Sequence, residues 1–187
     1  MVLLLLLSPI LLAVLLGMAL EMAVVARDRG PFLYREPRVS RGRIFELLKF
    51  RTLRTEVPAA GHARLSEADP ANLTWAGRRI LKPWYLDELP QLLNVLRGDI
   101  SLVGPRPWPP AMVERQAAEG RDYRRRIMAG LTGPAQVAKG SDQLYADLDE
   151  RYVVACRNLG GWALVRHDLG ILRQTIRVIA RGEGLSY

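Results

Sequence analysis

Cysteine and histidine are almost absent from this chain of 187 residues. Cys156 is the only cysteine, so an intrachain disulfide is excluded. With only His62 and His167 beside it, the sequence also argues against a structural zinc site, which is built mainly from cysteine and histidine. Any metal ion would therefore have to bind hard oxygen ligands, chiefly carboxylates.

Charged residues are absent from the apolar segment 2–20, which is long enough for a membrane helix. No Lys or Arg precedes Arg27, so the basic start of a cleaved signal peptide is also lacking. Ser8-Pro9 lies inside the segment, and proline bends a helix because it removes a main-chain donor and clashes with the preceding turn. We favour a re-entrant helix that enters and leaves by one membrane face over a straight transmembrane anchor. A kinked helix can also span the bilayer, so both remain open.

Acidic residues are fewer than basic ones, 19 against 27, which gives a formal net charge of +8. This excess favours an anionic partner: nucleic acid, a phosphate-bearing substrate or an anionic lipid leaflet. Nucleic-acid binding would call for aromatic residues interleaved with basic ones or a recognised helix motif, and neither is evident. We therefore expect no nucleic-acid partner.

The rest of the chain predicts an α+β fold that is mainly helical with short strands. Residues 1–29 are expected to form a membrane-inserted helix with the Ser-Pro break, and residues 30–187 one compact domain. Polar residues 56–72 are expected to form a loop or frayed helix, and 131–134 a turn. Strands are expected at 32–34, 44–48 and 101–104, and helices at 87–96, 109–126, 142–158 and 161–181.

The last of these helices has an apolar stripe beside a row of arginines. Such a helix either lies on a membrane surface or packs its stripe on its own domain, and the sequence favours neither use. The stripe is Leu164, Leu169, Leu172, Ile176 and Ile179, and the arginines are Arg166, Arg173, Arg177 and Arg181.

Two adjacent carboxylates, Asp87 and Glu88, open the helix expected at 87–96. The positive end of a helix dipole stabilises negative charge, although ordinary helix capping would explain the pair equally well. Arg106 stands between two prolines that restrict its main chain. Lys49 and Arg51 are expected on one side of a strand, because side chains alternate there. A solvated basic surface is the structural alternative, but carboxylates with several cations are what phosphoryl transfer requires.

Here the residues resemble the bacterial sugar transferase family, the small monotopic polyprenyl-phosphate phosphoglycosyl transferases. The central block, 86–96 and 98–107, is long and ordered, and the similarity covers nearly the whole chain. It is carried by residues 38–39, Phe45, 49–52, 86–96, 98–107, 130–133, Gln136, Asp149, Tyr152 and 168–169, together with the Ser8-Pro9 bend.

The resemblance implies transfer of a sugar-1-phosphate from a UDP-sugar to undecaprenyl (polyprenyl) phosphate, with release of UMP and initiation of a cell-surface polysaccharide or glycoconjugate. Asp87 would be the nucleophile that forms an aspartyl-phosphosugar intermediate, and Glu88 with Asp87 would bind Mg²⁺. The implied phosphate ligands are Lys49, Arg51, Lys82 and Arg106, and the implied donor contacts or supports are Gln91, Gln136 and Asp149.

The resemblance also implies a place on the bacterial inner membrane, with membrane lipid as a partner and the catalytic domain on the cytoplasmic face. The oligomeric state is left open, with a homodimer as one alternative, and a catalytically silent membrane scaffold of the same fold is the rival function. The sequence departs from the family pattern at Ser40, where glycine is usual, and at Lys82, where arginine is usual. Segment 77–87 is one residue longer than usual, and the usual basic lead before the apolar helix is missing.

Overall fold

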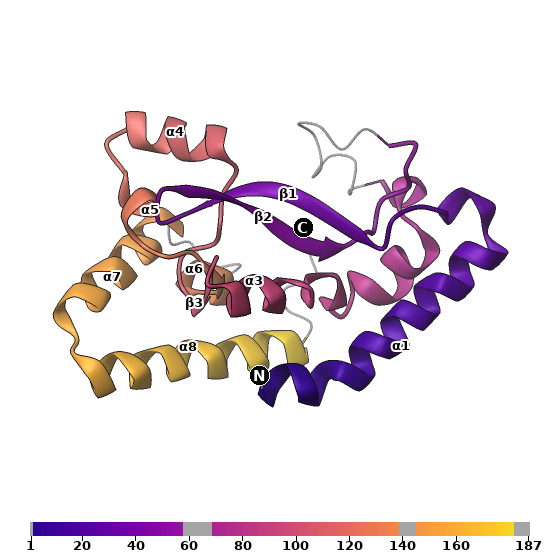
Figure 1. Cartoon of the computed structure of the whole chain (residues 1–187). Coiled ribbons are helices and arrows are strands. Elements are labelled where there is room, and N and C mark those ends of the chain that lie inside the picture. Colours follow the sequence, from indigo (N-terminus) through magenta and orange to yellow (C-terminus); the bar gives the residue numbers. More distant parts are fainter. Residues whose placement is uncertain (1, 58–68, 139–144, 182–187) are drawn as a thin grey trace. The chain divides into compact units, whose positions relative to one another are not determined.

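The computed structural model describes residues 2–57, 69–138 and 145–181, with side chains from residue 7 onward. The described chain is mainly helical and contains short strands (Figure 1). Its contacts divide it into two compact units. This division is based on contacts within the protein and does not test where a membrane-inserted part would end. The expected division into a membrane-inserted helix, residues 1–29, and one compact domain, residues 30–187, therefore stays a prediction. Among the described residues, the first unit comprises 2–35, 48–57 and 69–92, and the second 36–47, 93–138 and 145–181.

The apolar N-terminal segment forms helix α1, Val2–Val24. It runs through Pro9 without interruption, and Figure 1 shows it bending in its N-terminal part. Its stretch Leu7–Val24 is the one candidate membrane span among the described residues. The expected break is therefore a bend within a continuous helix.

One side of α1 packs against the first unit. Val14 and Met18, four residues apart and thus on the same face, contact Phe50 and Leu81 in a shared apolar cluster. Other apolar side chains of α1 are exposed and have the composition of a lipid-facing surface. These are Ile10, Leu12, Leu15, Leu16, Leu20 and Val24.

A buried carboxylate fixes the end of this helix to the rest of the first unit. Asp28, in the 3₁₀ turn Ala26–Asp28, is only 1% exposed. Its Oδ1 accepts a hydrogen bond from Arg54 Nε at 2.8 Å, and its Oδ2 accepts one from the Trp75 main-chain N–H at 3.0 Å. Its main-chain oxygen accepts a further bond from the Arg51 guanidinium at 2.6 Å. Asp28 therefore ties α1 to two later segments of the chain.

Strands β1, Leu33–Ser40, and β2, Arg43–Phe50, form a hairpin that confirms and extends the expected strands. The two connecting residues, Arg41 and Gly42, both have positive φ, 49° and 72°. This is what a type I′ turn requires, and it matches the twist of the paired strands.

In the second unit, β3, Ser101–Val103, pairs in parallel with β4, Gly130–Thr132. The turn expected at 131–134 is wrong, because residues 130–132 join the sheet and only then does the short helix α6, Pro134–Val137, begin. The main chains meet so closely that a Cβ on Gly130 would lie 2.1 Å from the Gly104 nitrogen. Glycine is therefore needed there.

The helix expected at 109–126 is two helices, α4, Pro110–Ala118, and α5, Tyr123–Arg126. The chain leaves the helical path at Gly120, which has a φ of 86°. The last two expected helices are confirmed as α7, Tyr145–Asn158, and α8, Gly161–Arg181, with residues 142–144 outside the described chain. Of the loop expected at 56–72, residues 58–68 also lie outside it, and Pro70–Asn72 form a 3₁₀ turn.

The Asp28 anchor makes a prediction about pH. Burial alone would raise the pKa of the Asp28 carboxyl, but its hydrogen bonds with Arg54, the Trp75 N–H and Glu21, together with the charge of Arg54, outweigh burial and hold this pKa below its ordinary value of 3.8. The stabilisation by Asp28 is therefore present above pH 3.8 and lost as the pH falls through the folded-state pKa.

Asp28→Asn should lower the free energy of unfolding at neutral pH by about 2 kcal/mol and flatten its acid dependence, because charge-assisted hydrogen bonds are lost. Chemical unfolding in detergent at a series of pH values would measure both effects. Asp122→Asn, which removes an exposed ion pair with Arg126, is the matched control and should change little. An unchanged acid profile in the Asp28 variant would contradict the anchor.

Candidate active site

The acidic pair lies in a 3₁₀ turn, Leu86–Glu88, and not at the start of a helix. Helix α3 begins only at Gln91 and ends at Arg97, with no acidic residue in its first turn. Pro90 accounts for the difference, because in a helix starting at 87 it would lack the N–H that bonds to the Leu86 carbonyl. The α-helix expected to begin at residue 87 therefore begins at Gln91, and the two carboxylates lie just before it.

Two unusual main-chain features precede the pair. Residues Gly77–Leu81 form a π-helical turn, closed by a bond from the Lys82 N–H to the Gly77 oxygen at 3.1 Å. Such turns absorb one extra residue and recur at functional sites, which fits the additional residue found between 77 and 87. Tyr85 then adopts a left-handed conformation with φ 53°, which costs a non-glycine residue energy. Local geometry thus sets the direction of the chain into Asp87.

Asp87 is 8% exposed, and Glu88 is half-buried. Among the residues that the structure describes, no three or more His, Cys, Asp or Glu side chains gather as a metal cluster. A pair of neighbouring carboxylates still suits Mg²⁺, which commonly uses one or two protein carboxylates and takes its remaining ligands from water and substrate phosphates. The donor set therefore fits the expected ion.

The expected cations of the first unit have different environments. Lys49 and Lys82 are half-buried, whereas Arg51 is 6% exposed. The Arg51 guanidinium donates to the main-chain oxygens of Pro31 at 2.8 Å, Leu53 at 2.9 Å and Asp28 at 2.6 Å. Strand β2 ends at Phe50, so the alternation that was expected to place Lys49 and Arg51 together does not reach Arg51. The contacts of Arg51 identify it as an internal anchor and argue against a phosphate ligand.

In the second unit, the main chain around Arg106 is held on both sides. The Gly104 N–H donates to Thr132, and the Pro105 oxygen accepts from the Gly130 N–H at 2.9 Å. The Trp108 oxygen accepts from the Val39 N–H at 3.0 Å. The half-buried Arg106 side chain thus extends from a rigid segment.

A buried arginine holds the carbonyl of Arg106 itself. Arg124, 4% exposed, donates to this oxygen, to Gln116 Oε1 at 3.0 Å and to Asp149 Oδ2 at 2.5 Å. Its guanidinium carbon also lies 4.0 Å from the centroid of the Trp108 ring. Asp149 has no exposed surface, so of the two roles expected for it the structure favours support over donor contact.

Asp149 receives a further hydrogen bond from the Tyr123 hydroxyl at 3.2 Å. Burial raises the pKa of Tyr123 to about 12, so this hydroxyl stays protonated and donates at neutral pH. The Oδ2 atom of Asp149 is thus paired with Arg124 and Tyr123, whereas its Oδ1 is buried without a hydrogen-bond partner among the described residues. Burial raises the pKa of this carboxyl above its ordinary value despite the charge of Arg124.

The two glutamines expected to contact or support the donor, Gln91 and Gln136, have different environments. Gln91 is 3% exposed at the start of α3. Gln136, in α6, has both amide heavy atoms buried without a hydrogen-bond partner among the described residues. A buried unpaired amide is costly, and a bound ligand would relieve that cost. This favours Gln136 over Gln91 as a donor contact.

The sequence analysis assigned no individual role to Asn94, which lies in the central block. Asn94 has no exposed surface, and its Nδ2 donates to the Glu46 main-chain oxygen at 2.8 Å and to Asp99 Oδ2 at 2.9 Å. It ties α3 to β2 and to the turn before β3. A buried asparagine between Leu93 and Val95 is a sequence signal for such a tie, although it does not name the partners.

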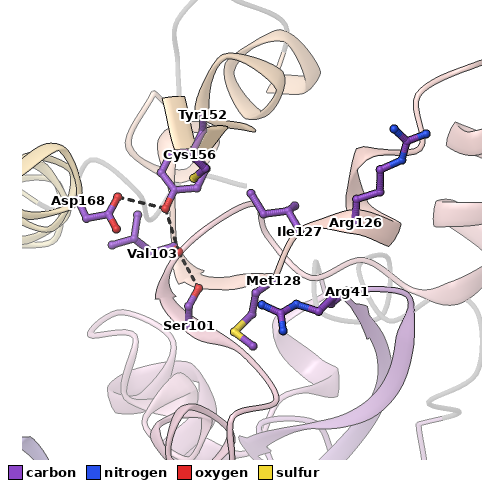
Figure 2. A pocket seen from close by; sticks show the side chains of 9 residues that line it. All are labelled: Arg41, Ser101, Val103, Arg126, Ile127, Met128, Tyr152, Cys156 and Asp168. Carbon is purple, nitrogen blue, oxygen red and sulfur yellow. Dashed lines mark hydrogen bonds between the residues drawn. The ribbon is translucent and has the colours of Figure 1, made fainter. Parts of the chain in front are cut away.

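The second unit also contains a cavity of about 250 Å³ that none of the expected site residues lines. Figure 2 shows the Tyr152 hydroxyl between Asp168 and Val103, 3.1 Å from Asp168 Oδ1 and 3.3 Å from the Val103 oxygen. Its single proton can be donated to either acceptor. Tyr152 and Asp168, both part of the resemblance, thus join α7 and α8 to β3. The cavity is lined by Arg41, Ser101, Val103, Arg126, Ile127, Met128, Tyr152, Cys156 and Asp168.

Comparison with known proteins finds similarity along the whole chain. The family model described as bacterial sugar transferase matches residues 1–182. The chain is 36% identical to the undecaprenyl-phosphate glucose phosphotransferase of Komagataeibacter xylinus, over 94% of this chain and 33% of that protein. It is 37% identical to the UDP-glucose:undecaprenyl-phosphate glucose-1-phosphate transferase of Caulobacter vibrioides, over 90% and 62% of the two chains.

A third relative is the undecaprenyl-phosphate galactose phosphotransferase of Salmonella typhimurium, which is 34% identical over 86% of this chain and 36% of that protein. The chain therefore spans between about one third and three fifths of the length of these relatives. The family match covers nearly all of the described residues, including Asp87, Glu88 and Arg106. The chain belongs to the bacterial sugar transferase family.

Proposed function

We propose that the protein transfers a sugar-1-phosphate from a UDP-sugar to undecaprenyl or another polyprenyl phosphate, as the first step of a cell-surface polysaccharide or glycoconjugate. The observation that carries the proposal is the family match over residues 1–182, together with relatives named for transfer of glucose or galactose phosphate to this lipid. The acidic pair and the cations of the chain supply the chemistry that such a transfer needs.

In the first step, a carboxylate oxygen of Asp87 attacks the phosphorus that carries the sugar. A new P–O bond forms to Asp87, the bond from this phosphorus to the bridging oxygen of UMP breaks, and UMP leaves with the electron pair. The product is a mixed anhydride between the carboxyl group and the sugar phosphate. Carboxylate nucleophiles form such acyl phosphates in other enzymes, and they divide one difficult transfer into two easier ones.

In the second step, a phosphate oxygen of the polyprenyl phosphate attacks the same phosphorus. The Asp87 P–O bond breaks, which restores the carboxylate and leaves the sugar joined to the lipid through a diphosphate. Lys49, Lys82 and Arg106 bind phosphate oxygens in this scheme, with the planar fork of Arg106 suited to two oxygens at once. Gln136 contacts the donor, while Gln91 and Asp149 support the protein around it.

Glu88, together with Asp87, would hold Mg²⁺. The bound ion supplies charge neutralisation at the phosphate oxygens, and the cationic side chains add to it. The neighbouring carboxylates and the small number of histidines in the sequence both support an oxygen-liganded ion.

The acceptor is a membrane lipid, so we also propose that α1 is inserted in the inner membrane as a re-entrant helix, with the catalytic part on the cytoplasmic face. Pro9 lies inside α1, and the bend in the N-terminal part of this helix supports the re-entrant form (Figure 1). The arginines that follow α1 suit the cytoplasmic side, where basic residues are favoured. These are Arg27, Arg29, Arg35, Arg38, Arg41 and Arg43.

A catalytically silent membrane scaffold of the same fold is the second candidate. Such a protein has no need of the acidic pair, of Arg106 or of the rigid main chain around it. Release of UMP from any member of a panel of UDP-sugars, in the presence of undecaprenyl phosphate, distinguishes the enzyme from the scaffold.

Asp87→Asn should abolish this UMP release, with a loss of at least about 10³-fold, because the amide is a poor nucleophile and leaves no second route to the intermediate. The assay uses detergent-solubilised protein, undecaprenyl phosphate and the sugar that the panel identifies. Asp69→Asn, at an exposed 3₁₀-turn cap in the same unit, is the control and should retain activity. Normal turnover by the Asp87 variant would remove it as the nucleophile.

Chelation of divalent ions should stop turnover, and added Mg²⁺ should restore it. Glu88→Gln should raise the Mg²⁺ concentration needed for half-maximal rate by about 10-fold or more, since a neutral amide is a weaker ligand than a carboxylate. A titration of rate against free Mg²⁺ measures this shift in both proteins. Activity that is indifferent to the chelator would reject the metal-binding role of Glu88.

A further inference from the structure

The cavity of about 250 Å³ lies wholly within the second unit, at a point where several elements meet. Strand β3 contributes Val103 to its lining, α7 contributes Tyr152 and α8 contributes Asp168. The turn between β1 and β2 contributes Arg41, and α5 contributes Arg126. The lining includes neither the acidic pair nor any of the expected phosphate ligands, so the cavity is a separate feature of the protein.

Hydrogen bonds within the second unit hold the walls of the cavity in place. The Tyr152 hydroxyl lies 3.1 Å from Asp168 Oδ1 and 3.3 Å from the Val103 oxygen, which joins three of the lining elements. The Arg41 main-chain N–H donates to the Ile127 oxygen at 3.0 Å, which fixes the turn of the hairpin against the segment after α5. The cavity is therefore preformed, as sites for small molecules usually are.

The two sides of the cavity differ in charge. Figure 2 shows Arg41 and Arg126 on one side, and Tyr152 and Asp168 on the other. Arg126 is paired with Asp122, whereas the Arg41 side chain has no acidic partner among the described residues. Asp168 uses Oδ1 toward Tyr152, and its Oδ2 accepts no hydrogen bond within the described part of the chain. One side thus offers an unpaired positive charge, and the other an acceptor with spare capacity.

The lining between these two sides is mainly apolar and includes Val103, Ile127 and Met128. Such side chains suit the carbon skeleton of a ligand, while a guanidinium binds phosphate or carboxylate oxygens and a carboxylate accepts hydrogen bonds from hydroxyl groups. Pockets for drug-sized ligands enclose about 300–1,000 Å³, so this cavity suits a smaller molecule than a whole nucleotide sugar.

We propose that this cavity binds a small hydroxylated anion, a sugar phosphate or a sugar acid, with its anionic group at Arg41 and its hydroxyl groups at Asp168. The chain continues from Val103 through Gly104 and Pro105 to Arg106, so the ligand would contact the strand that leads to a proposed phosphate ligand of the transfer reaction. The inference rests on the cavity and its lining, and not on the proposed transferase activity.

A native thiol reports whether the cavity is occupied. Cys156 lines it and is the only cysteine of the chain, so a thiol reagent modifies no other side chain of this kind. The full chain in detergent is treated with methyl methanethiosulfonate, which is small and uncharged, and the rate is followed by mass spectrometry of the intact protein. The probes are glucose 1-phosphate and glucuronate. Glucose lacks the anionic group and propyl phosphate lacks the hydroxyl groups, so both serve as control ligands.

At saturation, glucose 1-phosphate or glucuronate should slow the modification of Cys156 about five-fold or more, because a bound ligand fills the space beside the thiol. Glucose and propyl phosphate at the same concentration should have little effect, and the anion that protects identifies the kind of ligand. Arg41→Gln should raise the concentration needed for half-protection about 10-fold, because a charge-assisted hydrogen bond is lost. Arg43→Gln, which changes an exposed arginine of the same hairpin outside the cavity lining, is the matched control and should behave like the unaltered protein.

Protection by neither anion, equal protection of the Arg41 variant, or a thiol that does not react in the free protein would overturn the proposal. Protection that is lost in Asp87→Asn and kept in Arg41→Gln would place the ligand at the acidic pair and overturn it as well. The outcome is independent of the transferase assay. Protein that releases UMP but shows no protection refutes the cavity site alone, whereas protection without UMP release supports the cavity site and refutes the transferase proposal.

Discussion

The C-terminal end of α1 is fixed to the first unit by hydrogen bonds of two carboxylates, those of Glu21 within the helix and, above all, of Asp28 in the turn that follows. The Asp28 carboxylate is buried, and a buried carboxylate is stable only when it is paired and fully hydrogen-bonded. Arg54 and the Trp75 N–H meet that requirement. The same two contacts hold the chain after β2 and the start of the segment that leads through the π-helical turn and Tyr85 to Asp87. The position of the acidic pair within the first unit therefore depends on Asp28, in the turn that follows α1.

The second unit uses a buried ion pair in the same way. Arg124 and Asp149 contribute little net stability as a pair, because removing both charges from water costs about as much as their attraction returns. Their value is positional, since Arg124 is the donor that fixes the carbonyl of Arg106 and stacks on Trp108. In each unit, a buried charged side chain fixes the main chain near a residue that is proposed to bind the substrate.

Much of this architecture could be predicted from the sequence where local pattern decides it. The apolar run gives α1, the short strands expected at 32–34 and 44–48 give parts of β1 and β2, and helical periodicity finds α7 and α8. Prediction failed where contact with a distant segment, or a single residue, determines where a helix or strand forms. The three-residue strand β4 exists through its parallel pairing with β3, and Pro90 moves the start of α3 beyond the acidic pair.

The candidate site shows the same limit. The resemblance made Arg51 and Arg106 phosphate ligands and Asp149 a donor contact or a support, and the sequence does not show that Arg51 is committed to main-chain oxygens or that Asp149 is fully buried. The extra residue between Gly77 and Asp87 was visible in the sequence, but the π-helical turn that absorbs it was not.

The central claim is that Asp87 becomes covalently bonded to a sugar phosphate. The most direct measurement is mass spectrometry of the protein after exposure to its UDP-sugar and Mg²⁺ without any polyprenyl phosphate, followed by acid quench and proteolysis. The proposed mechanism predicts one added sugar phosphate on the peptide that contains Asp87, which disappears when the lipid acceptor is supplied before the quench. UMP release that occurs only with acceptor present and leaves no adduct, or an adduct on another residue, would contradict it.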